Sequence, residues 1–388
     1  MSHVVKLRVN GSDFVGFKGG EVRTGLDQIC SSFSLQYHDA RGAAEPTPIE
    51  AGDRCSLLVD DVVIMDGYVD DADVEYDAKS YRCTVSGRSL TMDAVDCTAM
   101  HRPSSWTNAP MSAIVADLIN EFGFQARFVG SQGDAFAKFR LNKGETVGDA
   151  IARLVRARGF VAYTVGSDLV IARAGATTTT TVIRAGDQVL RGKLHSSLSQ
   201  RYSDYYFRGQ TRANDTVNGI NAAQLDGHVQ DQGVKRRRPL LIVKGGHDSK
   251  ADLGQLAVLE RNQRAGRGER LTYTVRGWEH SGGLWTPNLR VRVMDSILNV
   301  DCEMLVVNVG YVFAADDPGY VTELELTRPE AYDVIDYPPR RRRREGIRDA
   351  RATTWPPGAT SPSGYGGQTY DQLIPWWQDP SGTIGGGR

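Results

Sequence analysis

The side chains best suited to chemistry, by type and spacing, lie between residues 70 and 91. Gly87-Arg88-Ser89 has the first three letters of a nucleophile elbow, the tight turn that exposes a serine for acyl transfer, but Thr91 stands where the second glycine belongs. Asp70, Asp71 and Asp73 form an acidic cluster that could bind a cation, yet the ligand order of an EF-hand is absent. We therefore expect a solvated loop at the aspartates and a structural role for Ser89.

Other patterns for catalysis or cofactor binding are weak or missing. The sequence contains no H-E-x-x-H motif, no metal-like spacing of cysteine and histidine, and no P-loop. Gly266-Arg267-Gly268 lacks the third glycine of a dinucleotide-binding loop and precedes a predicted strand. The cysteines are scattered without C-x-x-C, as in a chain that folds in a reducing cytoplasm, and the histidines are spread singly. We predict no enzyme, no catalytic residue, no metal site and no cofactor.

The charge is nearly balanced, and a net charge of −1 argues against a strongly basic nucleic-acid-binding protein. From Tyr337 onward, proline, glycine and arginine replace any periodic apolar pattern, which predicts an extended tail. Its arginine run either keeps a linker solvated and extended or docks on an acidic surface or a phosphate backbone, while the large aromatic residues favour partner binding. The predicted partner-binding residues are Arg340, Arg341, Arg342, Arg343, Arg344, Trp355, Trp376 and Trp377.

The chain of 388 residues predicts two to three domains, and 40% hydrophobic with 24% charged residues is typical of a globular protein. No window approaches 18 consecutive apolar residues, so we expect no transmembrane helix and no membrane partner. The first residues lack the apolar region of a secretory signal, so we expect none.

Residues 1–99 alternate apolar and polar side chains in the manner of short antiparallel strands, which predicts a small barrel or sandwich. Turn signals such as Asp66-Gly67 separate the strands, and one short helix is expected over residues 26–31. Strands are expected at residues 4–9, 32–37, 54–59, 62–65, 67–76 and 81–86.

The end of this region, Gly87 to Ala99, reads as a junction. We expect the Ser89 hydroxyl to cap a short helix, with Met92 and Val95 on one face of it. Asp93 and Asp96 are expected to fix the joint rather than to contact a substrate.

Residues 100–175 change to the period of an α+β domain. The chain up to Pro110 reads as a loop, and the first helix is expected from Met111 to Phe122. A second helix is expected after Thr146, where Asp149 three residues on resembles a capping box. A hairpin is expected around Gly166-Ser167-Asp168.

Residues 176–334 return to the β pattern, with a helical insertion expected over about residues 250–264. The threonine run at residues 177–181 fits either a linker or a strand, because threonine suits both. Further strands are expected at residues 196–201, 203–210, 271–276, 289–294, 304–313 and 320–326.

The predicted fold class is therefore mainly β with an α+β insert. Two similar small β-barrel, tube-like domains at residues 1–99 and 176–334 flank the α+β domain, and an extended tail follows at residues 335–388. The two β-rich regions share an order of parts, although any two small β domains can look alike. If the repeat is real, a trimer would present six similar units and could meet a six-fold partner.

The stretch from Gly87-Arg88-Ser89-Leu90-Thr91 to Val95-Asp96-Cys97-Thr98-Ala99 resembles the signature of Mu-type phage tail baseplate hub proteins, of the late control or baseplate hub family. The resemblance covers about residues 3–334, and similar folds are those of the T-even phage hub and the N-terminal part of type VI secretion spike proteins. Supporting segments, in order, are Leu26-Asp27-Gln28-Ile29, Asp66-Gly67-Tyr68-Val69, Lys143-Gly144-Glu145-Thr146, Arg208-Gly209-Gln210 and Leu284-Trp285-Thr286-Pro287-Asn288.

That resemblance implies a structural virion protein, assembled in the host cytoplasm and located in the baseplate of a contractile tail. It implies a homotrimeric ring that adapts the six-fold tail tube to the three-fold central spike. The implied partners are other copies of the chain, the spike, the tube or distal tube protein, the tape-measure protein and baseplate wedge proteins.

Two alternatives stay open. One is a cell-wall-degrading or peptidoglycan-binding tail hub, which would depend on residues 139–173, where Lys143-Gly144-Glu145-Thr146 weakly matches a LysM repeat. The other is the spike of a secreted injection machine rather than a virion component.

Overall fold

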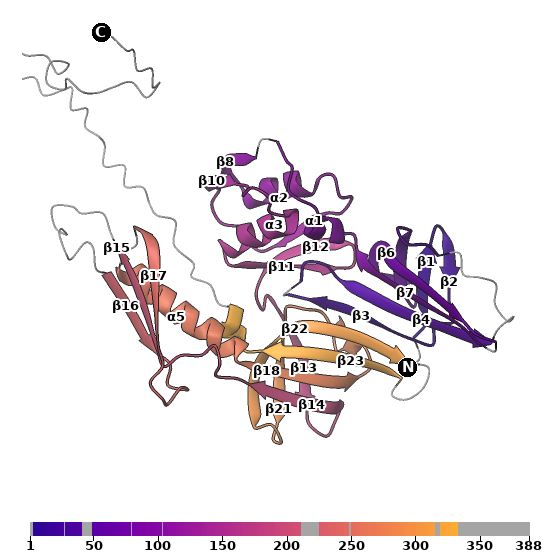
Figure 1. Cartoon of the computed structure of the whole chain (residues 1–388). Helices are drawn as coiled ribbons and strands as arrows, with labels where there is room; N and C mark the ends of the chain where they lie inside the picture. The colour runs from indigo at the N-terminus through magenta and orange to yellow at the C-terminus, as the bar shows by residue number, and fades with distance from the viewer. Residues whose placement is uncertain are drawn as a thin grey trace, which may run out of the picture. The chain divides into compact units, whose positions relative to one another are not determined.

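The largest element of the protein is a single 13-stranded sheet that contains strands from both β-rich regions (Figure 1). The computed structural model describes residues 3–26, 28–40, 49–78, 80–102, 104–210, 225–247, 250–314 and 319–332. The first region contributes β1 (Val5–Val9), β2 (Ser12–Phe14), β3 (Gly19–Gly25), β4 (Ser32–Ala40), β5 (Arg54–Val59), β6 (Val62–Tyr76) and β7 (Ser80–Ser89).

The alternation of side chains explains why these segments form strands. In β1, Val5, Leu7 and Val9 are buried, whereas Lys6 and Arg8 point to the other face. The second region contributes β13 (Thr177–Arg184), β14 (Val189–Ser196), β18 (Glu269–Arg276), β21 (Leu289–Asp295), β22 (Val300–Ala314) and β23 (Tyr320–Thr327). The threonine run is therefore a strand, since β21 offers it a parallel partner.

The strand order confirms the predicted repeat. The first region is ordered β3-β4-β7-β6-β5-β1, and the second is ordered β14-β18-β23-β22-β21-β13. The long strands β6 and β22 both contain 15 residues and occupy equivalent places. The one difference in direction is that β1 runs antiparallel to β5, whereas β13 runs parallel to β21.

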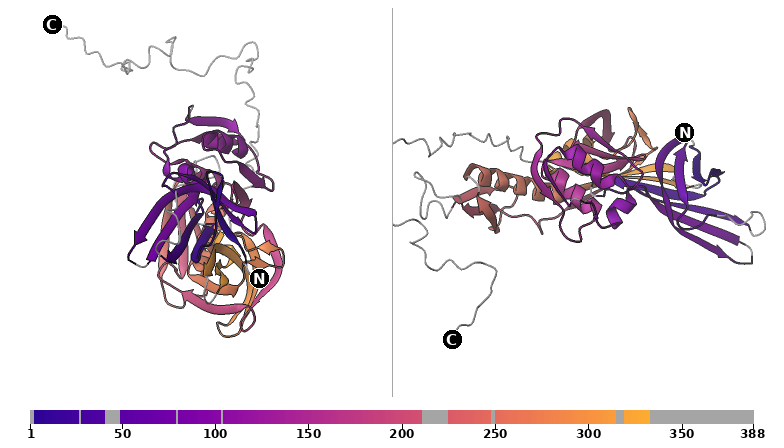
Figure 2. Two further views of the ribbon diagram at one scale, coloured as in Figure 1. Left: turned by 90° about the vertical axis from the view of Figure 1, so that its right-hand side faces the viewer. Right: turned by 90° about the horizontal axis from the view of Figure 1, so that it is seen from above.

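The two regions are joined through β3 and β22, which pair antiparallel from Gly19↔Ala314 to Gly25↔Asn308. Both views of Figure 2 show the strands of the two regions lying side by side. One core runs across the joint and contains Leu35 and Leu57 of the first region with Tyr273 and Leu324 of the second. The prediction of two separate barrels is wrong in this respect, because strand pairing is continuous between the regions and no pairing within the described ranges closes either one.

The α+β unit has its own core, around Met111, Ile114, Ile151 and Leu154. Its sheet β11-β12-β9 combines a hairpin, as predicted, with a parallel third strand. Its elements are α1 (Met92–Asp96), β8 (Ser105–Ala109), α2 (Met111–Ile119), β9 (Ala126–Val129), β10 (Phe136–Arg140), α3 (Val147–Arg156), β11 (Phe160–Val165) and β12 (Asp168–Arg173).

A small sheet in the second region packs on α5 (Lys250–Arg267), which confirms the predicted helical insertion. Leu253 and Ala257 of this helix are fully buried against Tyr205 and Phe207. The remaining elements are β15 (Asp204–Gln210), β16 (Leu225–Gln230), β17 (Pro239–His247), β19 (Glu279–His280), β20 (Gly283–Leu284) and η1 (Pro329–Tyr332).

Four local predictions are wrong, and in the first three a partner outside the local pattern is the cause. The helix expected over residues 26–31 is absent from the described part of that segment, and the Leu26 amide instead donates to Val307 O at 2.8 Å. The expected turn at Asp66-Gly67 is the middle of β6, paired on both sides. The expected loop before Pro110 contains β8, which pairs with β10, and the strand expected at residues 196–201 ends at Ser196.

The N-cap of α3 gives a first testable prediction. The Thr146 hydroxyl accepts a hydrogen bond from the Asp149 amide at 3.1 Å, as the sequence predicts. Thr146→Ala should lower the free energy of unfolding by about 1 kcal/mol, because one amide at the helix start loses its partner. Urea unfolding measures the change, and the exposed Thr107→Ala in β8 is the control; equal losses in the two variants would contradict the capping role.

Candidate functional site

The junction at Gly87 to Ala99 is a buried polar joint and not a catalytic turn. Ser89 lies at the end of β7, is fully buried, and accepts a hydrogen bond from the Ser31 amide at 3.0 Å. Its hydroxyl also contacts Thr91 Oγ1 at 2.8 Å and the thiol of Cys30 at 3.4 Å. The prediction that Ser89 caps α1 is wrong. Thr91 is the N-cap residue, and the Ser89 hydroxyl instead bonds the Ser31 amide next to β4. Burial also raises the pKa of Cys30.

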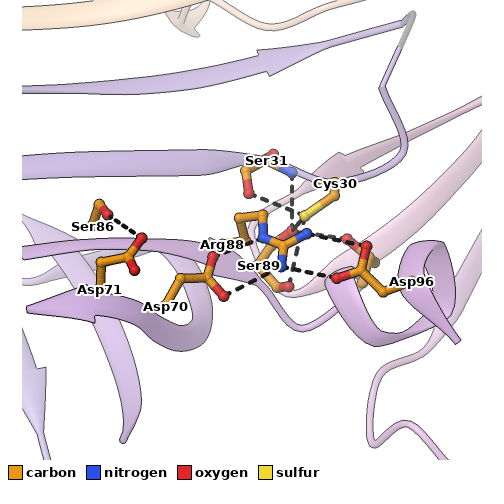
Figure 3. A network of polar contacts seen from close by, with 9 residues as sticks. Cys30, Ser31, Asp70, Asp71, Ser86, Arg88, Ser89 and Asp96 are labelled. Carbon is orange, nitrogen blue, oxygen red and sulfur yellow. Dashed lines mark hydrogen bonds and ion pairs between the residues drawn. The ribbon is translucent and has the colours of Figure 1, made fainter. Parts of the chain in front are cut away.

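Arg88 ties the strands to α1, and Figure 3 shows its guanidinium between two carboxylates. Its Nε donates to Asp70 Oδ2 at 2.7 Å, and its Nη2 lies 2.9 Å from Asp96 Oδ2. Hydrogen bonds from Arg88 to Asp70 and then to Asp96 raise the pKa of the guanidinium. Asp96 therefore fixes the joint as predicted, whereas Asp93 contributes its backbone carbonyl, which accepts from the Cys97 amide.

The acidic cluster is part of a strand and not a solvated loop. Asp70, Asp71 and Asp73 all lie in β6, where Asp70 is bound to Arg88 and the Ser86 hydroxyl lies 3.5 Å from Asp71. Asp70 is therefore engaged by the Arg88 guanidinium and Asp71 contacts the Ser86 hydroxyl, which gives these carboxylates structural partners. Among the residues that the structure describes, no group of three or more histidine, cysteine or acidic side chains could hold a metal ion.

The Lys143-Gly144-Glu145-Thr146 segment, on which the peptidoglycan alternative depends, is bonded to the start of α3. Arg153 donates to Glu145 Oε1 at 2.6 Å, and the Asn142 amide donates to the same atom at 2.6 Å. Burial raises the pKa of Glu145, but the hydrogen bonds from Arg153 and Asn142 outweigh it and lower the pKa below its usual range. An ionised, fully partnered carboxylate cannot act as a general acid.

Glu145 gives a second prediction, on pH dependence. Its pKa is lower in the folded than in the unfolded chain, so its stabilisation is present above the unfolded pKa and is lost as the pH falls through the folded one. Glu145→Gln should destabilise the protein at pH 7 and flatten the loss of stability below about pH 4.5. Thermal melting from pH 3 to 8 tests this, and unchanged acid sensitivity would contradict it.

The predicted partner-binding residues of the tail lie outside the described residues. They are Arg340, Arg341, Arg342, Arg343, Arg344, Trp355, Trp376 and Trp377. Within the described ranges, no helix is long and apolar enough to cross a membrane.

The structural feature that most bears on function is the joint between β3 and β22. The repeat contains equivalents of both strands, β14 and β6, and among the described residues neither has a strand partner on the corresponding edge. β22 pairs with β21 through residues 300–305 and with β3 through residues 308–314. In the equivalent strand β6, residues 62–68 pair with β5, whereas the strand pairings of residues 69–76 within the described chain run to β7. The equivalent of β3 is β14, whose described partner is β18.

These edges are surfaces that sequence reasoning missed. Strand edges expose unpaired amide and carbonyl groups, which invite pairing with another chain. Alternation predicts which residues form a strand but not which strand lies beside it, so only the repeat contained a signal for them.

Three family models match the chain. They are described as Mu phage baseplate assembly protein GpP-like, N-terminal, at residues 4–89; baseplate hub protein gp44-like, second domain, at residues 91–173; and Mu phage baseplate assembly protein GpP, fourth domain, at residues 251–335. The chain is 27% identical over 355 residues to baseplate hub protein gp44 of Escherichia phage Mu, covering 89% of this chain and 93% of that protein.

Several solved structures have a fold similar to that of this chain. The 43 kDa tail protein of prophage MuSo2 from Shewanella oneidensis has a TM-score of 0.76 at 26% identity, covering 86% of this chain and all of that one. A tail protein from Neisseria meningitidis has a TM-score of 0.71 at 20% identity, covering 85% and 99%. A type VI secretion component of E. coli shares the fold alone, with a TM-score of 0.51 at 11% identity, covering 86% and 80%. Over most of its length the chain thus matches the domain models and a hub protein of the Mu-type phage tail baseplate hub family.

Proposed function

We propose that this protein is a structural hub of a contractile-tail baseplate, where it forms a homotrimeric ring that adapts the six-fold tail tube to the three-fold central spike. The observation that carries the proposal is the repeat: six strands in one order occur twice in one chain. Three such chains present six similar sheets, which is a route from three-fold to six-fold symmetry. The two six-strand repeats of the sheet would be the walls of tube-like domains at residues 1–99 and 176–334, with the α+β domain at 100–175 between them in the sequence.

The proposed partners are the spike on one side, the tube protein on the other, and the tape-measure and wedge proteins around them. The name of the phage Mu relative, a baseplate hub protein, supports this location. The proposal assigns no catalysis, since the side chains that could do chemistry, Ser89 and Glu145, are held by structural partners. Assembly would take place in the host cytoplasm, before the tail is complete.

Native mass spectrometry of the purified chain with the spike of the same phage tests the adaptor role. We expect a complex of three hub chains with one trimeric spike. A chain lacking residues 338–388 is expected to remain a trimer and to lose the spike, because the tail is proposed to anchor it through arginine and tryptophan side chains. Normal spike capture by the truncated trimer would overturn the role of the tail, and failure of the full chain to bind the spike would overturn the adaptor role.

A further inference from the structure

We propose that the ring is closed by β14 of one copy pairing antiparallel with residues 71–76 of β6 in a second copy, with Lys193 opposite Glu75, Leu194 opposite Val74 and His195 opposite Asp73. This inference rests on the proposed trimer and goes further, because it names the surface, its residues and its register. It follows from the joint within the chain, where β3 pairs with β22.

The equivalence of β6 and β22 is fixed by an irregularity that both strands contain. The pairing of β6 with β7 shifts between Val69 and Asp71, and the pairing of β22 with β23 shifts between Val306 and Asn308. Bulges of this kind bend a strand at a defined place, so they align the two strands. Asp71 then corresponds to Asn308, and by counting along the strands Val74 corresponds to Tyr311 and Glu75 to Val312.

The equivalence of β3 and β14 follows across the neighbouring strands. Ser86 and Glu325 are the residues that pair with Asp71 and Asn308, and they pair in turn with Ser34 and Thr272. Ser34 pairs with Glu21 of β3, whereas Thr272 pairs with Lys193 of β14. Lys193 therefore corresponds to Glu21, and Leu194 and Gly192 correspond to Val22 and Gly20.

The equivalent positions define the register between the edge of β14 and the edge of β6. Within the chain, Glu21 lies opposite Val312, Val22 opposite Tyr311, and Arg23 opposite Gly310. The equivalent pairs are Lys193 with Glu75, Leu194 with Val74, and His195 with Asp73. Continuing one step at the end of the strand places Gly192 opposite Tyr76, as Gly20 lies opposite Phe313.

The side chains at these positions are complementary in charge on one face and in shape on the other. One face of the pairing joins a lysine and a histidine of β14 to two carboxylates of β6, and such pairs favour one register and exclude shifted ones. The Glu75 side chain is 79% exposed, and its ion-pair contact with Arg82 is distant at 3.8 Å. Lys193 and His195 are also exposed.

The other face is apolar and exposed where its counterpart is buried. Val74 is 53% exposed and Tyr76 is 67% exposed, whereas the equivalent Tyr311 and Phe313 are 6% and 5% exposed. A partner strand that places Leu194 and Gly192 over this face would bury it, in the way that β3 buries its counterpart. Gly20 lies so close to Phe313 that a Cβ would meet the ring at 2.9 Å, and Gly192 would give Tyr76 the same room.

The occupant is a second copy of this chain because each chain supplies one edge of each kind. The contact is head to tail, so it propagates from copy to copy until rotation closes a ring. Charge-paired edges of this kind do not self-pair, since two β14 edges would place like charges opposite each other.

Disulfide crosslinking of the full-length chain tests the register. In a Cys97→Ser background, which removes the exposed native thiol, Lys193→Cys with Glu75→Cys should crosslink on mild oxidation into dimers and trimers on a non-reducing gel, because directly opposed residues satisfy disulfide geometry. Lys193→Cys with Asp71→Cys, four residues out of register, is the matched control and should stay at chain mass.

Charge reversal tests the energetics independently. Lys193→Glu or Glu75→Lys alone should raise the dissociation constant of the assembly by about 100-fold, and the double variant should restore most of the loss. Lys138→Glu, an exposed reversal in β10, should leave assembly unchanged. A trimer that neither crosslinks nor responds to reversal would overturn this register while leaving the proposed function intact, and a chain that stays monomeric at all concentrations would overturn both.

Discussion

Gly87→Val should unfold the first β-rich region or leave it barely stable, with a loss of about 4 kcal/mol in the free energy of unfolding. Gly87 lies in β7, between Phe33 of β4 and Val69 of β6. A Cβ at this position would meet the Tyr68 carbonyl at 2.2 Å and the Phe33 ring at 2.7 Å. A backbone carbonyl held in a sheet cannot move aside as a flexible side chain can, so the strands must separate.

A matched glycine variant separates this clash from the general effect of replacing glycine. Gly254 lies in α5, and a Cβ there would meet nothing within 4 Å. Gly254→Ala should therefore stabilise the protein by about 0.5–1 kcal/mol, because alanine favours the helix. Thermal melting of both variants measures the contrast, and a melting temperature for Gly87→Val within a few degrees of the unmodified chain would contradict the close approach of β6 and β7.

Asp295→Ala should cost about 3 kcal/mol, because it leaves the buried Tyr273 hydroxyl and two part-buried backbone amides without their acceptor. Asp295 ends β21 and is 4% exposed. The Tyr273 hydroxyl donates to its Oδ2 at 2.9 Å, and the amides of Ile297 and Leu298 donate to its Oδ1 at 2.8 and 2.9 Å. Burial and then this hydrogen bond raise the pKa of Tyr273, so the phenol stays a donor.

The control is an aspartate on the same hairpin that lies at the surface. Asp301 forms an exposed ion pair with Arg292, and such pairs contribute about 0–1 kcal/mol. Asp301→Ala should therefore have little effect in the urea unfolding series that shows the large loss for Asp295→Ala. If the two variants lost equal stability, the buried hydrogen bonds would not be the cause.

The sequence predicts most strands because burial on one face imposes a period of two. In β1 and in β21, every second residue is buried, and that pattern is visible without a structure. Helices α2, α3 and α5 are predictable for the same reason, with a period of 3.6. Thr146 could be identified as a cap because capping depends only on residues three positions apart.

The errors come from contacts between residues far apart in the chain. Leu26 and Ile29 have the spacing of a helix face, but the Leu26 amide pairs with Val307 and the Ile29 carbonyl accepts from Thr91 and Thr164. Ser89 is a residue type that often caps helices, but its hydroxyl oxygen accepts a hydrogen bond from the Ser31 amide, 58 residues away. No local pattern contains these partners, and the same is true of the joint between β3 and β22 that organises the fold.

The central claim is that the chain assembles into a three-membered ring, and the most direct test is the mass of the purified full-length protein in solution. Light scattering at micromolar concentration should give three times the chain mass of 42.5 kDa. Lys193→Glu should shift that value toward the single chain, and Lys193→Glu with Glu75→Lys should return it. A mass of one chain at every concentration up to the limit of solubility would contradict the ring.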